Sequence, residues 1–284
     1  MKFLPPDRTP KVAVVGFGYV GSCVAATLAG CGISVCCIDN DRHLVEEMRA
    51  DYWRFNEPGL AESLARALDD GALTLTDDYQ AVKSADVIII AVGTPVDARR
   101  AIVTEHLEEV CAVLAPLIRP GQLIIVKSTV APGTTTKLVR SLLEEAGAVQ
   151  GLDFGLAFCP ERLAEGSALA QFRTLPIVVG GCDKESADSA RAFWAAALDV
   201  DVLEFSSPEV AELVKLAGKI PARATGYSRA VRCSISGHHP PGARHDQGAE
   251  GAGLGARHVT SLGTDADHRV GEGQPVLAGR ELGI

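Results

Sequence analysis

Long apolar runs and a surplus of positive charge are both missing from the sequence. No stretch of the 284 residues reaches the roughly 18 apolar residues that a membrane-spanning helix needs, so we expect no such segment. The first residues, MKFLPPDRTPK, are too few and too proline-rich for a secretory signal. Lys and Arg number 27 against 36 Asp and Glu, a net charge of −9, which argues against a nucleic acid or an anionic membrane as partner.

Paired cysteine spacing is missing as well. The eight cysteines show no C-x-x-C pattern, and several, such as Cys36 and Cys37, lie inside apolar runs. We therefore expect buried thiols in a reducing cytoplasm rather than disulfides or a metal site. The histidines His238, His239 and His245 cluster without carboxylates or cysteines at a metal-binding spacing, so no metal is predicted.

What the sequence does contain is a strand, glycine turn and helix near its start. The segment 11–41 reads KVAVVGFGYVGSCVAATLAGCGISVCCIDND. Gly16 permits a tight turn, Gly18 lets the backbone approach a pyrophosphate, and Gly21 lets the helix pack closely on the strand. The helix, 19–30, would direct its free N–H groups and its positive dipole end at the phosphates. The pattern predicts a dinucleotide site.

An acidic residue at the end of the next strand indicates which dinucleotide. The apolar run 33–38 ends in Asp39, where a carboxylate can accept both ribose hydroxyls of NAD and repel the 2′-phosphate of NADP. NAD is therefore the predicted cofactor. Arg42 opens a helix over 42–49 and either contacts the adenosine side of the cofactor or lies on the solvated surface.

The rest of the first two hundred residues alternates strands with helices. With 47% hydrophobic residues the chain can bury a sizeable core, and the alternation predicts an α/β class with a doubly wound parallel sheet of the Rossmann type. Further strands are expected at 73–76, 87–92, 122–127, 155–159, 177–179 and 202–205, and helices at 60–68, 105–117, 136–146, 185–197 and from 206.

Three helix or strand ends carry specific expectations. Thr94 follows the most apolar strand, 87–92, and either faces the cofactor or caps its own turn. One of the threonines in the segment 128–135 is expected to cap the helix 136–146. The helix after residue 205 begins either with a capping box of Ser206 and Glu209 or with Ser207 as cap and Pro208 in the first turn.

Together the motifs resemble those of the UDP-glucose/GDP-mannose dehydrogenase family. The matching stretches are GFGYVG, CIDND, FNEPGL, AVGTP, KSTVAPGTT, CPERLAEG and ELVKLA, in family order over residues 11–217. The resemblance implies a homodimeric cytoplasmic enzyme of polysaccharide precursor synthesis. Such an enzyme uses NAD to oxidise the C6 alcohol of a nucleotide sugar to a carboxylate. UDP-glucose and a UDP-N-acetylhexosamine are both left open as substrate.

Residue roles also follow from this resemblance. Glu161 is expected to be the general base, assisted by Thr129 through a water, and Lys215 to stabilise developing oxyanion charge. Glu161 and Glu165, four residues apart, are expected to project into one cleft. The implied cofactor contacts are Gly16, Gly18, Tyr19, Val20, Gly21, Asp39, Arg42, Thr94, Thr129 and Glu165, and the implied substrate contacts are Glu161, Arg162, Leu163, Glu165 and Lys215.

The resemblance ends near residue 218. Lys219 stands where the family has an asparagine, and Cys233 does not match the family's nucleophilic cysteine loop. Residues 220–284 hold 12 of the 29 glycines, 5 of the 7 histidines and no lysine, phenylalanine or tryptophan. Such a composition cannot offset the entropy of ordering, and it is typical of translation in a wrong reading frame.

We therefore expect three parts: an NAD-binding domain at 1–205, the start of a dimerisation helix at 206–219, and a frameshifted or disordered tail at 220–284. Without the cysteine and the UDP-binding domain the chain is expected to be inactive. Two alternatives stay open. One is a non-catalytic NAD-binding remnant. The other is a β-hydroxyacid dehydrogenase, which would need a catalytic lysine in an all-helical second domain and which CPERLAEG argues against.

Overall fold

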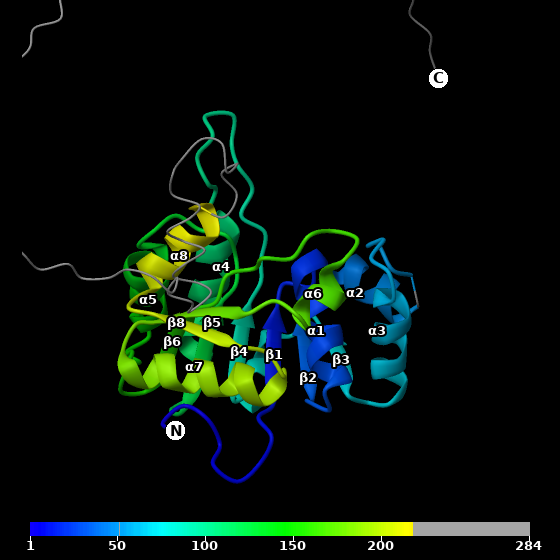
Figure 1. Ribbon diagram of the computed structural model, residues 1–284, viewed down its shortest axis with the longest axis horizontal. Coiled ribbons are helices and arrows are strands. Elements are labelled where there is room, and N and C mark those ends of the chain that lie inside the picture. The colour runs from blue at the N-terminus through cyan, green and yellow to red at the C-terminus, as the bar shows by residue number, and fades with distance from the viewer. Residues whose placement is uncertain (51, 218–284) are drawn as a thin grey trace, which may run out of the picture. The chain divides into compact units, whose positions relative to one another are not determined.

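The computed structural model describes residues 1–50 and 52–217, and these form an α/β fold around one eight-stranded sheet (Figure 1). The strand order is β3-β2-β1-β4-β5-β6-β7-β8. The strands are β1 Val12–Val15, β2 Val35–Ile38, β3 Leu73–Thr76, β4 Val87–Ile90, β5 Gln122–Val126, β6 Phe154–Phe158, β7 Ile177–Gly181 and β8 Val202–Phe205. The predicted fold class is confirmed for this part of the chain.

The helices lie on both faces of the sheet (Figure 1). The α-helices are α1 Tyr19–Gly30, α2 Arg42–Arg49, α3 Leu60–Asp69, α4 Glu105–Leu114, α5 Arg140–Glu144, α6 Ala168–Phe172, α7 Lys184–Ala197 and α8 Pro208–Ala217. Shorter turns are the 3₁₀ segments η1 Tyr79–Ser84 and η2 Ala115–Leu117, and a π-type turn η3, Thr134–Val139.

Side chains of the central strands alternate between two hydrophobic clusters, one on each face. In β1, Val12 and Val14 pack into the cluster that includes α1, α3 and α7, whereas Ala13 and Val15 pack into the cluster that includes α4, α5 and α8. Strand β4, all of it buried, divides in the same way. Because alternate side chains are buried on opposite faces of the sheet, every position of these strands is apolar, and their sequences are continuous apolar runs.

One strand pair departs from the expected all-parallel sheet. The strands from β3 to β6 in the sheet order are parallel to one another, but β7 pairs with β6 in the antiparallel sense, and β8 is parallel to β7. A parallel neighbour would need a crossover that returns the chain to the starting edge. The β6–β7 connection instead carries only the short helix α6 and leaves β7 running the opposite way.

A buried carboxylate in α8 explains why a capping prediction was wrong. No threonine side chain caps the turn that opens at Thr134; its N-terminal residue is Gly133, at φ +90°. The buried carboxylate of Glu212 in α8 accepts hydrogen bonds from the N–H of Gly133 at 2.6 Å and of Thr135 at 2.9 Å. Burial raises the pKa of Glu212. A carboxylate from a distant helix has replaced the local hydroxyl.

Two other boundaries also differ from the sequence expectation for local reasons. The helix 105–117 is α-helical only to Leu114 and continues as the 3₁₀ turn η2, which contains Pro116; proline cannot donate the next helical hydrogen bond. At α8 the second capping alternative is the one observed. Val210 N–H donates to Ser207 Oγ at 3.5 Å, and Pro208 is the first helical residue.

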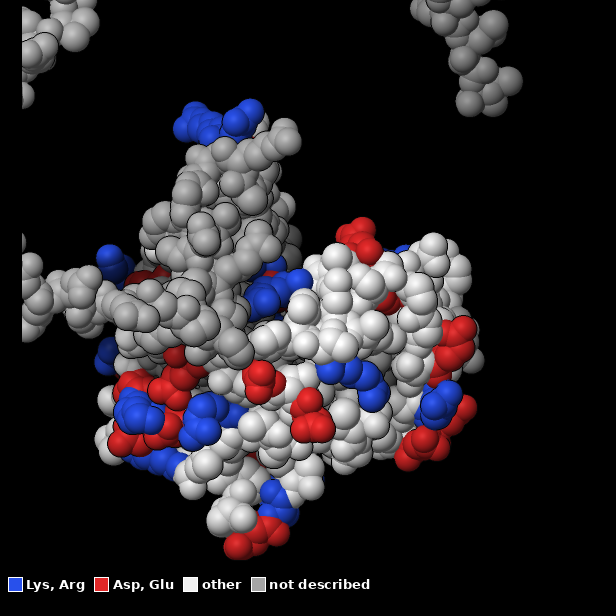
Figure 2. Space-filling view, in the orientation of Figure 1, with Lys and Arg blue, Asp and Glu red and all other residues white. Residues whose placement is uncertain are grey.

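Acidic and basic side chains are intermixed on the face shown in Figure 2. One such group joins α7 to β8, where Lys184 and Arg191 each form ion pairs with Asp188 and Glu204. Such exposed pairs contribute little stability each. Within residues 1–50 and 52–217 no helix has both the length and the apolarity that a membrane crossing requires.

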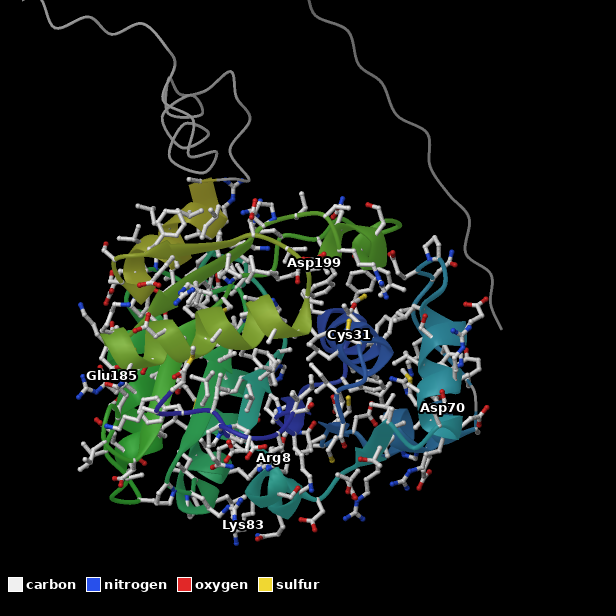
Figure 3. The ribbon with its side chains drawn as sticks, turned by 60° about the horizontal axis from the view of Figure 1, so that its bottom comes forward. Arg8, Cys31, Asp70, Lys83, Glu185 and Asp199 are labelled. Carbon is white, nitrogen blue, oxygen red and sulfur yellow. The ribbon has the colours of Figure 1, made fainter. Side chains whose placement is uncertain are left out.

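Six of the seven described cysteines are buried or half-buried, and Cys31, at the end of α1 (Figure 3), is exposed. Burial raises the pKa of Cys111 to about 12 and that of Cys159 to about 11. Thiolate is the reactive form, so these buried thiols are protected by both access and ionisation.

We predict that a thiol-specific maleimide at neutral pH labels Cys31 first among the cysteines of residues 1–50 and 52–217. Peptide mapping by mass spectrometry should find Cys111 and Cys159 modified only after denaturation. The variant Cys31→Ser is the control, and the peptide that contains residue 31 should no longer be labelled in it. Fast native labelling of Cys159 would contradict the buried placement. Cys233 lies outside the described residues and is followed as a separate peptide.

Candidate functional site

The glycine turn after β1 is shaped by close backbone contacts. Gly16 has φ +91°, and a Cβ there would lie 2.9 Å from the backbone nitrogen of Val92. A Cβ on Gly21 would lie 1.9 Å from the carbonyl oxygen of Gly16, so α1 can rest on the turn only with glycine there. A Cβ on Gly18 would meet nothing within 4 Å. The turn is therefore packed at its two ends and open at Gly18, as a pyrophosphate cradle requires.

Asp39, at the end of β2, is bonded to this turn. Its Oδ2 accepts from the N–H of Phe17 at 2.7 Å, and its Oδ1 accepts from the N–H of Asp41 at 3.0 Å. Each carboxylate oxygen can accept a further bond, so both remain able to take a ribose hydroxyl. The predicted neighbours Tyr19 and Val20 are half-buried at the start of α1.

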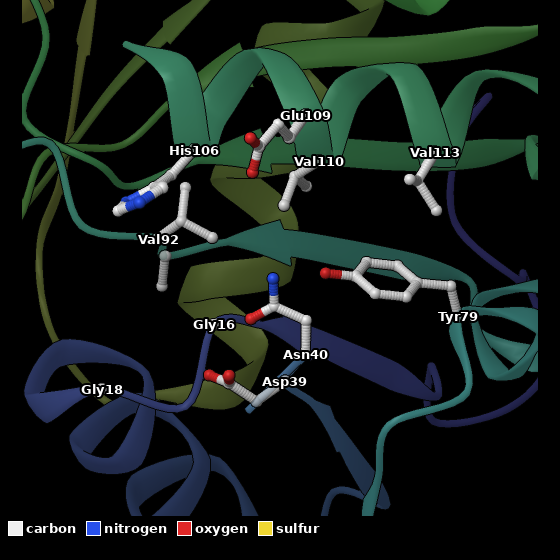
Figure 4. Close-up of a pocket in the computed structure, with 11 residues that line it drawn as sticks. Gly16, Gly18, Asp39, Asn40, Tyr79, Val92, His106, Glu109, Val110 and Val113 are labelled. Carbon is white, nitrogen blue, oxygen red and sulfur yellow. The ribbon is translucent and has the colours of Figure 1, made fainter. Parts of the chain in front are cut away.

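The turn and Asp39 open into a pocket of about 380 Å³ between the ends of β1, β2 and β4 and helix α4 (Figure 4). Eight of its eleven lining residues are not among the predicted contacts: Asn40, Ala91 and Val92 lie at the ends of predicted strands, and the other five come from two further elements. Four lie on α4, spaced so that they share one face of the helix, and the fifth is in the turn η1 opposite. They are His106, Glu109, Val110, Val113 and Tyr79. The helical spacing of the first four is visible in the sequence and could have indicated this face.

Two predicted cofactor contacts have other partners in the structure. Arg42 forms an ion pair with Asp77 at 2.6 Å, and its side chain is 81% exposed. Thr94 donates through Oγ1 to the carbonyl of Thr129 at 2.6 Å. Thr94 thus does not cap its own turn but ties the loop after β4 to the loop after β5. The cofactor roles of both residues stay predictions.

Glu57, in the FNEPGL motif, joins three parts of the site. Its Oε2 accepts from the Tyr19 hydroxyl at 2.6 Å and from the N–H of Gly166 at 2.7 Å, and its Oε1 accepts from the N–H of Ala168 at 2.7 Å. Burial alone would raise the pKa of Glu57, but these donors hold it below its ordinary value of 4.5. The carboxylate fixes the CPERLAEG loop against the N-terminus of α1.

The two glutamates of that loop have different surroundings. Glu161 is buried, and its Oε1 accepts from the N–H of Leu163, which turns the side chain back toward its own loop. Glu165 is exposed. Arg162 and Leu163 are half-buried; burial lowers the pKa of Arg162. The expected shared cleft for the two carboxylates is therefore not shown by these contacts.

The proposed catalytic residues come from three elements at the carboxyl edge of the sheet. Thr129 follows β5 and Glu161 follows β6. These two strands are parallel neighbours, and their last residues, Val126 and Phe158, lie opposite each other. Lys215 lies in α8 and is 8% exposed. Because Glu212 of the same helix binds the backbone at Gly133, α8 is fixed to the loop that carries Thr129.

Comparison with known proteins identifies the family of this chain. The NAD binding domain of the UDP-glucose/GDP-mannose dehydrogenase family matches residues 10–198. The chain belongs to this family. The match leaves the β-hydroxyacid dehydrogenase alternative without support, and it makes NAD the cofactor of this domain.

Relatives in the family differ in the nucleotide sugar for which they are named. GDP-mannose 6-dehydrogenase of Pseudomonas putida is 32% identical over 211 residues, which are 72% of this chain and 48% of that protein. The structure of GDP-mannose dehydrogenase from Pseudomonas aeruginosa, a ternary complex, has a TM-score of 0.71 at 30% identity, covering 75% of this chain and 50% of that one.

A UDP-glucose dehydrogenase structure from the archaeon Pyrobaculum islandicum is 38% identical, with a TM-score of 0.68, and covers 76% of this chain and 50% of that one. The chain thus spans about half the length of the curated relatives it matches. No group of three potential metal ligands occurs in residues 1–50 and 52–217. The histidine cluster at 238, 239 and 245 lies outside the described residues.

We predict that Glu57→Gln destabilises the fold by about 2–3 kcal/mol, because hydrogen bonds to a charged acceptor are lost and the new amide N–H₂ faces a backbone N–H donor, that of Gly166 or of Ala168. The native pKa is lowered, so the charge of Glu57 stabilises the fold above about pH 4.5 and this contribution is lost as the pH falls through the native pKa. Chemical denaturation at pH 7 and pH 3.5 measures both effects.

The Glu57→Gln variant should therefore differ more from the wild type at pH 7 than at pH 3.5. The control Glu46→Gln, an exposed change on α2, should cost less than about 0.5 kcal/mol at either pH. Equal losses for the two variants at pH 7 would contradict the role assigned to Glu57.

Proposed function

We propose that the pocket beside the glycine turn binds NAD and that the site serves oxidation of the C6 alcohol of a nucleotide sugar to the acid. The observation that carries the proposal is the joint placement of the open Gly18 and the Asp39 carboxylate on one pocket, bonded through Phe17. NAD supplies the hydride acceptor in this chemistry. The residues present fit it: backbone N–H groups at a helix start for phosphates and a carboxylate for ribose hydroxyls.

The lining of the pocket suggests where the adenosine lies. Tyr79 on one side and Val110 and Val113 on the other provide apolar surface for an adenine ring, next to Asp39 at the ribose (Figure 4). Gly16, Tyr19, Val20 and Gly21 shape the phosphate end. Arg42 and Glu165 are proposed as further cofactor contacts, and Thr94 as a support of the Thr129 loop that faces the nicotinamide.

At the other end of the site we propose three catalytic residues. Glu161 removes the proton of the substrate hydroxyl, with Thr129 holding a water beside it. Lys215 stabilises negative charge on the substrate oxygen, which a buried cation does well in a water-poor site. Arg162, Leu163 and Glu165 are proposed to contact the substrate from the CPERLAEG loop.

The substrate class is a nucleoside diphosphate sugar, and a UDP-sugar is our specific proposal. The similarity to a UDP-glucose dehydrogenase supports it, and the similarity to GDP-mannose dehydrogenases makes GDP-mannose the competing substrate to test. We also propose the division into an NAD-binding domain at 1–205, the start of a dimer-forming helix at 206–219 and a non-family tail at 220–284. The last of these lies outside the described residues.

We further propose that this chain acting alone binds NAD without completing the oxidation. The match covers about half of each relative, and no part of residues 220–284 resembles the family's nucleophilic cysteine loop. A non-catalytic NAD-binding remnant is the alternative. Incubation of the purified chain with NAD and either UDP-glucose or GDP-mannose should yield no sugar acid. Net acid formation with either substrate would overturn this part of the proposal.

We predict that Asp39→Asn weakens NAD binding about tenfold or more and reduces the preference for NAD over NADP, because it removes the charged acceptor for the ribose and the repulsion of a 2′-phosphate. Isothermal titration calorimetry with both dinucleotides measures this. The control Asp70→Asn, exposed at the end of α3 (Figure 3), should bind as the wild type does. No heat of NAD binding to the wild type would refute the proposed cofactor site in this chain.

A further inference from the structure

A buried lysine that the proposed mechanism does not use lines the same small cavity as Glu161. Lys127 follows β5 and is 1% exposed. Its Nζ lies 5.0 Å from the ring centroid of Trp194 and 5.4 Å from that of Phe172. The aromatic faces stabilise a cation without neutralising it. Within the described residues the ammonium has one hydrogen-bond acceptor, the carbonyl of Cys159 at 3.4 Å, for its three N–H groups.

The carboxylate of Glu161, in turn, lacks a hydrogen-bond donor for one of its oxygens. One oxygen, Oε1, accepts from the N–H of Leu163, whereas Oε2 is fully buried and has no hydrogen-bond partner. One guanidinium nitrogen of the adjacent Arg162, Nη1, is buried and unpartnered as well. Buried charged groups left without partners are costly, so native structures compensate them with ions, hydrogen bonds or ordered water.

All three groups line one small cavity. Its lining comes from Lys127, the segment 160–163 and residues around α6, and its volume is about 20 Å³. A water molecule needs about one probe sphere of such volume, roughly 10–15 Å³, and two to four polar partners. The cavity therefore has room for a single water, and the unpartnered Oε2, the Lys127 ammonium and the Arg162 guanidinium supply the polar partners.

We propose that Lys127 is a positioning residue for Glu161 and is bound to its Oε2 through one water in this cavity. This inference rests on the proposed role of Glu161 as the base. The pairing follows from topology: β5 and β6 are neighbours in parallel register, so residues 127 and 159 are side by side, and Glu161, two residues further on, lines the same cavity as Lys127. With Oε1 held by Leu163 and Oε2 by the water, the carboxylate is kept in one orientation.

A double-mutant cycle without NAD tests the coupling. Lys127→Met and Glu161→Gln should each lower the Tm by at least ~5 °C, because each leaves the other charge buried and uncompensated. The double variant should lose much less than the sum of the two single losses, since it removes both charges. Lys127→Arg keeps the charge and the donors and should restore most of the coupling.

The matched control combines Lys127→Met with Glu57→Gln, a buried carboxylate that does not line this cavity. Those two losses should add. Additive losses for Lys127→Met and Glu161→Gln would refute the pairing. Because the cycle needs no dinucleotide, its failure is distinguishable from a failure of the wild type to bind NAD.

A crystal structure of the wild-type chain provides a second test that does not require the variants to fold. We expect an ordered water within hydrogen-bond distance of Lys127 Nζ and Glu161 Oε2. A cavity without ordered density, or a direct contact between the two groups that leaves no room for water, would overturn the bridged arrangement.

Discussion

The contact between the first helix and the first turn is the constraint on which the site depends. A side chain on Gly21 would overlap the carbonyl oxygen of Gly16, and one on Gly16 would press on the backbone at the end of β4. Because these positions carry only hydrogen, α1 begins directly above the carboxyl edge of the sheet. Its free N–H groups, the acid at the end of β2 and the loops after β4 and β5 lie at this same edge.

Buried carboxylates connect the loops at the edge of the sheet to the helices. Glu57 binds the CPERLAEG loop to α1, Glu212 binds α8 to the loop after β5, and Glu161 binds the backbone of its own loop. In the first two cases the acceptor satisfies two backbone N–H groups that the loop geometry leaves without partners. The burial of these two carboxylates is tolerated because backbone N–H groups donate to them the hydrogen bonds that water would donate to an exposed carboxylate.

How much the sequence could predict depended on whether an interaction is local. Strand β1, the helix Tyr19–Gly30 and the strand before Asp39 follow from periodicity and glycine spacing within thirty or so residues, and they were predicted closely. The cap from Glu212 joins residues 77 and 79 positions apart, and no local pattern indicates it. The antiparallel direction of β7 depends on the path of the chain between β6 and β7, which the amino-acid composition does not specify.

The pocket residues are an intermediate case, since the helical spacing of His106, Val110 and Val113 is visible but looks like any amphipathic helix. Only the sheet order, which places β4 beside β1, brings that face over Asp39. The pocket beside Asp39 is lined by residues between 16 and 113, whereas the proposed catalytic residues Thr129, Glu161 and Lys215 lie in the loop after β5 and in later elements. The pocket and the proposed catalytic side chains thus come from successive parts of one sheet.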